Sequence, residues 1–95
     1  MKDELITTLE FEIREEFHIP PYFENLDNLI NQSNSALLML VDNINYDDDL
    51  VARGLLKNRV FYDYNNKVNE FAVDYAQDIL TWQFSKIDGV GEVDG

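Results

Sequence analysis

The stretch that decides the fold is residues 50–64, which read LVARGLLKNRVFYDY. Its apolar side chains recur at steps of three and four residues, and this periodicity predicts an α-helix. They spread over most of the helix circumference, so that only Gly54 and Asn58, with Asn65 just beyond, form a polar strip. A helix that is apolar on most sides must be covered on more than one side. We expect it to lie centrally in its own bundle and also to contact a neighbouring copy.

Three acidic residues stand directly before this helix. Asp47, Asp48 and Asp49 place negative charge where a helix start exposes its free amides and its positive dipole end, so we predict that they cap the helix. Three consecutive acids also occur in calcium-binding loops, but the spacing of residues here does not match an EF-hand. An EF-hand loop beginning at Asn43 needs glycine where Asp48 stands and an acid where Gly54 stands. We therefore expect no metal site and no cofactor.

Three more helices are expected, two before this segment and one after it. An amphipathic helix over residues 5–17 ends before Pro20 and Pro21, because a proline pair removes two amide donors. A second helix is expected over residues 23–41. The asparagine-rich residues 65–69 weaken the helix, and a last helix covers residues 70–87. The sequence is compatible with separate third and fourth helices and equally with one kinked helix.

The sequence thus predicts an all-α fold, a small bundle of four helices. Ninety-five residues leave room for one domain of marginal stability. With 45% hydrophobic residues, the chain has enough apolar side chains to form a core. We expect a single helical domain over residues 1–88 and a flexible glycine-rich tail over residues 89–95.

The net charge and the composition exclude several classes of protein. A formal charge of -12 argues against reading nucleic acid through phosphate contacts, and against binding an anionic membrane. The chain has no cysteine, which excludes disulfides, thiolate metal sites and thiol nucleophiles. No signal peptide is visible, and no apolar run reaches the ~18 residues that a membrane-spanning helix needs. We expect a soluble protein made in the cytosol.

Nothing in the sequence predicts an enzyme. The one histidine, His18, has no serine, cysteine or second histidine in a catalytic or metal-binding pattern, and is interpreted as a helix-end or core-edge residue. Three of the four glycines lie in residues 89–95, so no glycine-rich phosphate loop is present. The numerous carboxylates are explained as a solvated charged face.

The charge is unevenly distributed along the chain. Residues 50–70 carry Arg53, Lys57, Arg59 and Lys67 against two acids, whereas the segments on both sides are acidic. Blocks of opposite sign either meet inside one chain or join neighbouring copies. For Arg53, Lys57 and Lys67, which align along one flank, solvated charges at helical spacing and a contact to a neighbour's acids are both open.

Several apolar and aromatic residues exceed what one small bundle needs. Phe11, Leu38 and Met39 fall off the main apolar face of their helices, so a lone chain would leave them exposed. Aromatic side chains with a polar tip, such as Tyr62 and Tyr64, are preferred at protein interfaces. The candidate subunit or partner interface is therefore Phe11, Leu38, Met39, Arg53, Lys57, Arg59, Lys67, Tyr62 and Tyr64.

The second half of the chain carries a longer pattern. It is Ala52-x-x-Leu55-Leu56-x-x-Arg59-Val60-x-Tyr62-x-Tyr64-Asn65-Asn66, then Phe71, then Tyr75-x-x-Asp78-Ile79-Leu80-x-x-Gln83. This pattern resembles the C-terminal half of the small head-tail connector (adaptor) proteins of long-tailed bacteriophages. The first helix and the acid- and leucine-containing residues 24–30 are also similar to that family, so the resemblance covers about residues 1–86. The pair Pro20 and Pro21 departs from it, since a short acidic loop is expected there.

The resemblance implies a structural virion protein. Such a chain is made in the host cytoplasm and forms a ring of its own copies, a dodecamer, beneath the portal protein at the head-tail interface. The ring extends the channel through which DNA passes without sequence-specific binding, and it docks the stopper or tail-completion protein. Two other classes stay open: an acidic mimic of DNA that inhibits a host defence enzyme, and a small regulatory partner of the antitoxin kind.

Overall fold

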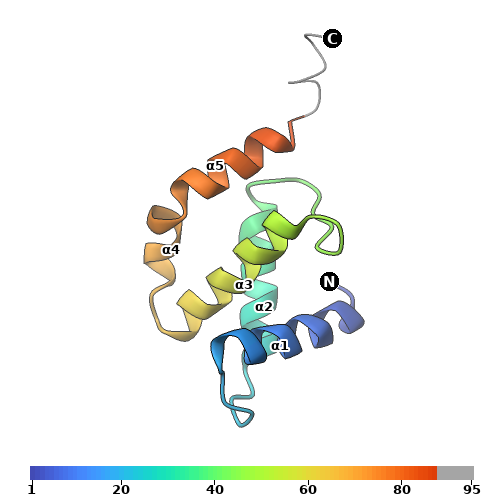
Figure 1. The fold of residues 1–95 in the computed structure, drawn as a ribbon, viewed down its shortest axis with the longest axis vertical. Coiled ribbons are helices and arrows are strands. Elements are labelled where there is room, and N and C mark those ends of the chain that lie inside the picture. The colour runs from blue at the N-terminus through green and yellow to red at the C-terminus, as the bar shows by residue number, and fades with distance from the viewer. Residues whose placement is uncertain (88–95) are drawn as a thin grey trace.

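The structure, a computed structural model, describes residues 1–87 and confirms the all-α fold class. Within these residues it contains helices only, and Figure 1 shows their arrangement. In chain order they are α1 (Asp3–Phe17), α2 (Leu26–Leu38), α3 (Leu50–Tyr64), α4 (Val68–Asp74) and α5 (Ala76–Ser85). The glycine-rich tail expected over residues 89–95, and the expected domain limit at residue 88, lie outside the described residues.

The central helix α3 has the predicted bounds. Asp49 is its N-cap, and one carboxylate oxygen of Asp49 accepts a hydrogen bond from the Ala52 amide at 3.0 Å. The helix ends at Tyr64, and Asn66 follows with a φ of 60°, a left-handed conformation that asparagine adopts more readily than most residues. The chain then turns back into α4, so α3 and α4 are separate helices.

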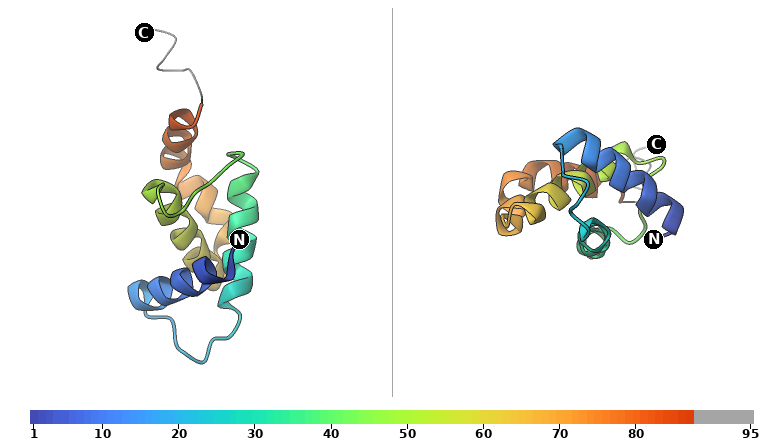
Figure 2. Two further views of the ribbon diagram at one scale, coloured as in Figure 1. Left: turned by 90° about the vertical axis from the view of Figure 1, so that its right-hand side faces the viewer. Right: turned by 90° about the horizontal axis from the view of Figure 1, so that it is seen from below.

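The first two helices cross one another, as the side view in Figure 2 shows. The predicted end of α1 before the proline pair is confirmed, with His18 as its left-handed C-cap. The helix expected over residues 23–41 is too long at both ends. Before α2, the Phe23 amide bonds to the Pro20 carbonyl in a turn, and after it the Leu40 amide bonds to the Leu37 carbonyl, which tightens the last turn.

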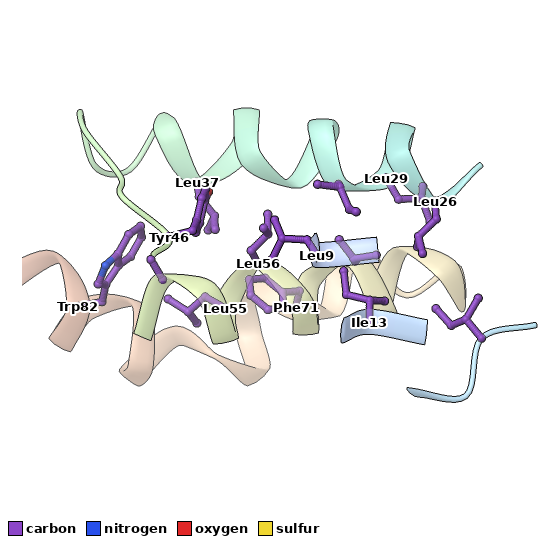
Figure 3. Packing of buried hydrophobic residues seen from close by; sticks show 14 residues of the cluster. Leu9, Ile13, Leu26, Leu29, Leu37, Tyr46, Leu55, Leu56, Phe71 and Trp82 are labelled. Atoms are coloured by element: carbon purple, nitrogen blue, oxygen red, sulfur yellow. The ribbon is translucent and has the colours of Figure 1, made fainter. Parts of the chain in front are cut away.

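The core lies where α1, α2 and α3 meet. Figure 3 shows α2 running alongside α3, with Leu9 and Ile13 of α1 packed between them. By contrast, α4 and α5 add one buried residue each, Phe71 and Trp82. The buried hydrophobic residues are Leu9, Ile13, Ile19, Leu26, Leu29, Ile30, Leu37, Tyr46, Ala52, Leu55, Leu56, Val60, Phe71 and Trp82.

The prediction of one helix over residues 70–87 is wrong. The helix begins at Val68 and breaks at Tyr75, whose φ of -106° and ψ of 16° are not helical. The described chain therefore has five helices instead of four. The physical reason is tertiary: the bend turns α5 so that Trp82 is buried against the start of α3, and this packing overrides the local helical preference.

Candidate interaction surfaces

The ion pairs between α1 and α3 decide the role of the basic segment. Arg53 donates from Nε to Glu12 Oε1 at 3.0 Å, and Lys57 Nζ lies 3.2 Å from the same oxygen and also pairs with Glu16. The hydrogen bond from Arg53 is the main cause that lowers the pKa of the Glu12 carboxyl. We call Glu12, Glu16, Arg53 and Lys57 the charged seam.

The charged seam shows that blocks of opposite charge meet inside the chain. The side chains of Arg53 and Lys57 are each only 14% exposed and already face acidic partners on α1. Arg53 and Lys57 are therefore not solvated charges, which is one of the two alternatives left open by their spacing, and both have acidic partners on α1 of the same chain. Ion pairs that are partly shielded from water contribute more than surface pairs do.

Two other basic residues of the candidate interface lie elsewhere. Arg59 donates from Nη1 to the hydroxyl of Ser33 at 3.1 Å, and Ser33 is fully buried, so Arg59 joins α3 to α2. Lys67 is exposed at the turn between α3 and α4. The structure thus does not bring Arg59 and Lys67 into one patch with the charged seam.

The two candidate tyrosines also make contacts inside the chain. Tyr62 donates its hydroxyl to Asp74 Oδ2 at 2.7 Å, and this bond raises the pKa of Tyr62 to about 12. Tyr64 meets the ring of Phe23 edge to face, with centroids 4.9 Å apart. The first contact joins α3 to α4, and the second joins α3 to the loop before α2.

The apolar candidates are exposed, as their positions on the helices predict. Phe11 is 67% exposed, Met39 is 87% exposed and Leu38 is 40% exposed. Leu38 also lines a groove of about 630 Å³ between the start of α1 and the loop that precedes α3. These residues are the part of the predicted interface that the chain itself leaves uncovered.

The sequence analysis missed a second apolar surface. Leu80, Phe84 and Ile87 are 47%, 56% and 51% exposed and follow one another at steps of four and three residues, so they share one side of α5 and its C-terminal extension. We call them the α5 face. Helical spacing from Trp82 alone does not separate this face from the core, because α5 lies at the rim and its one fully buried side chain is Trp82.

Three polar contacts hold α5 against the rest of the chain. Trp82 Nε1 donates to Asp49 Oδ2 at 2.9 Å, Lys86 Nζ lies 2.7 Å from the same oxygen, and Gln83 Nε2 donates to the Leu40 carbonyl at 3.2 Å. Burial raises the pKa of Asp49, but the hydrogen bonds from Lys86, Ala52 and Trp82 outweigh it and the net shift is downward. We call these three contacts the α5 latch.

The described residues show neither a metal cluster nor a membrane span. Among residues 1–87, no three histidine, cysteine, aspartate or glutamate side chains are grouped so that they could hold a metal ion. No helix in the same range combines the length and the apolar character needed to cross a bilayer. Comparison with known proteins finds no matching family model, no matching curated protein and no matching solved structure.

Proposed function

We propose that this chain is a structural subunit that assembles into a closed ring, and that the ring is a head-tail connector of a long-tailed bacteriophage. In this role it lies beneath the portal protein, extends the DNA channel and docks the stopper or tail-completion protein. The observation that carries the proposal is the α5 face, a stripe of three apolar side chains that is left uncovered among the described residues.

A ring needs a contact between two different surfaces of the chain. Figure 1 shows α1, which carries the exposed Phe11, and α5 towards opposite ends of the molecule, so a contact that joins them is heterologous. Such a contact builds a ring where the rotation between copies closes, and an open filament where it does not. A contiguous exposed apolar stripe such as the α5 face is typical of an interaction site, whereas single exposed apolar residues are common on any protein.

The charge of the chain suits a channel around DNA. Arg53 and Lys57 are paired with Glu12 and Glu16 inside the chain, and most of the acidic side chains among residues 1–87 are exposed. A wall of the same sign as the DNA phosphates lets the duplex pass without binding to it. This supports passage of DNA and not its recognition.

The same outward acidity favours a second candidate, an acidic mimic of DNA that occupies the basic groove of a defence enzyme. A mimic forms a small soluble complex with one partner enzyme, and it needs no uncovered apolar stripe. A ring subunit needs that stripe and forms a large assembly. The two proposals therefore differ in the size and in the location of the assembled protein.

Immunoelectron microscopy tests the proposed function. Tailed virions made from the genome that encodes this chain are treated with a gold-labelled antibody raised against it, and the same antibody preincubated with purified chain is the control. The proposal predicts label at the head-tail junction, exposed after tails are detached from heads. Virions that lack the chain, or label confined to another part of the particle, would contradict the proposal.

A further inference from the structure

The break between α4 and α5 has no local cause in the sequence. Residues 68–85 contain neither glycine nor proline, and their periodicity predicts one unbroken helix. Helical hydrogen bonds run up to the break on both sides: the Tyr75 amide bonds to the Phe71 carbonyl at 2.9 Å, and the Ile79 amide to the Tyr75 carbonyl at 2.8 Å. A change of backbone angles near Tyr75 is therefore enough to join α4 and α5.

Joining the two helices has a favourable consequence for the backbone. The first amides of a helix have no carbonyl partner within it, and no side chain caps the start of α5. In one continuous helix these amides would find carbonyls at the end of α4. The α5 latch and the burial of Trp82 hold the bent form at a distance from the bend. At the bend itself, the Tyr75 ring stacks on Phe71 and meets Tyr62 edge to face.

Every contact of the α5 latch can also be made between two copies. The surface that receives α5 consists of Asp49 at the start of α3 and the Leu40 carbonyl after α2, together with the space that Trp82 fills. This receiving surface is the same in each copy, so the α5 of another copy fits it with no new chemistry. An exchange of identical elements is a low-cost route to an assembly.

We propose that α5 is exchanged between copies in the assembled protein. In the exchanged form α4 and α5 are one continuous helix, and α5 packs on the receiving surface of the next copy. We call the exchanged α5 the arm. Each copy then gives its own arm to one neighbour and receives the arm of another, which is a head-to-tail contact of the kind that a ring requires. This inference rests on the proposed ring and names the contact that builds it.

Cysteine cross-linking tests the exchange directly, because the chain has no cysteine of its own. Val51 and Ser85 are both exposed, belong to neither the α5 face nor the α5 latch, and line one surface hollow of about 410 Å³ between the start of α3 and α5. In the double variant Val51→Cys/Ser85→Cys, a short bis-maleimide joins the receiving surface to α5. The inference predicts links within single chains at low concentration and a ladder of linked chains in the assembly.

A matched pair that avoids the arm is the control. Thr8 and Asp47 are exposed and line the groove between α1 and the loop before α3, so Thr8→Cys/Asp47→Cys is linked within one chain in both states. A ladder from both pairs, or from neither pair in an assembly whose mass is confirmed, would overturn the exchange.

A proline at the hinge tests the continuous helix. In the bent form the Ala76 amide bonds to no backbone carbonyl, so a proline there removes no hydrogen bond, whereas in a continuous helix the same position is interior and proline breaks it. Ala76→Pro is expected to lower the yield of the chain-to-chain ladder more than about tenfold, whereas the control Ala76→Ser keeps it. An unchanged ladder in a folded Ala76→Pro would overturn the inference; if this variant does not fold, the Val51→Cys/Ser85→Cys result decides alone.

The mass of the assembly, measured on the same samples, separates this inference from the proposed function. A closed ring whose arm links stay within single chains contradicts the exchange and leaves the ring standing. Exchanged arms in a dimer support the exchange and contradict the ring. A chain that stays monomeric, alone and with portal rings, and gives no ladder contradicts both.

Discussion

Trp82 and Asp49 lie 33 residues apart in the sequence, and the indole Nε1 of Trp82 donates to a carboxylate oxygen of Asp49 at 2.9 Å. The other oxygen of Asp49 accepts from the Ala52 amide and caps α3. One carboxylate therefore starts the central helix and fixes the last one. The attachment of α5, and with it the exposure of the α5 face, depends on this residue.

Replacement of Asp49 tests this dependence. Asp49→Ala removes the cap of α3 and leaves the buried Trp82 N–H without its acceptor, so the free energy of unfolding is expected to fall by about 2–4 kcal/mol. Urea denaturation followed by tryptophan fluorescence measures this, since Trp82 is the only tryptophan. Asp48→Ala, at an exposed position next to it, is the control and is expected to change stability by less than about 0.5 kcal/mol. Equal losses in the two variants would show that Asp49 has no special role.

The charged seam predicts a dependence of stability on pH. The folded chain holds the pKa of Glu12 below its ordinary value of 4.5, chiefly through the hydrogen bond from Arg53. The unfolded chain therefore takes up the proton first, and the contribution of Glu12 is complete above pH 4.5 and lost as the pH falls through the lowered pKa. The stability difference between the wild-type chain and Glu12→Gln should shrink below pH 4.5. A difference that stays constant down to pH 2.5 would contradict the pairing.

An exchange of charges tests whether the seam acts inside one chain. Arg53→Glu places two carboxylates together and is expected to destabilise the monomer by about 2–4 kcal/mol, because both side chains are partly buried. Adding Glu12→Arg restores an ion pair and should recover at least about 1 kcal/mol of the loss. The measurement is thermal unfolding at a concentration where the chain is monomeric. No recovery in the double variant would contradict the pairing of Arg53 with Glu12 inside the chain.

Replacement of Phe84 tests the α5 face. Phe84→Glu places a charge in the middle of the apolar stripe and is expected to weaken assembly by at least about tenfold, since charge is depleted at the centre of interfaces. The melting temperature of the monomer should not change, because Phe84 is 56% exposed. The concentration dependence of light scattering measures assembly. Gln77→Glu, at another exposed position on α5, is the matched control, and an equal effect there would indicate general charge repulsion.

Local signals in the sequence predicted most of the fold. The proline pair ended α1, Asp49 capped α3 at the predicted place, and the asparagines near residue 66 separated α3 from α4. Each of these depends on the conformational preference of one or two residues. The break at Tyr75 escaped prediction because it comes from the burial of Trp82 against the start of α3, a contact that no local pattern encodes.

The candidate interface was only partly predictable for the same reason. Helical spacing predicted that Phe11 and Met39 are exposed, and the structure confirms it. The direction of a side chain on a helix follows from its position in the sequence. The partners of Arg53 and Lys57 lie 41 or more residues away on α1, beyond the reach of any spacing rule. The α5 face required the bend of α4 and α5 to be known first.

The mass of the assembled protein is the sharpest test of whether this chain forms a closed ring. Native mass measurement is made on the purified chain at rising concentration, and on the chain mixed with portal rings. A ring subunit is expected to give one closed assembly of a single copy number, formed by the chain alone or on the portal, and lost in Phe84→Glu. A chain that stays monomeric in both samples, or that forms an open-ended series of sizes, would contradict it.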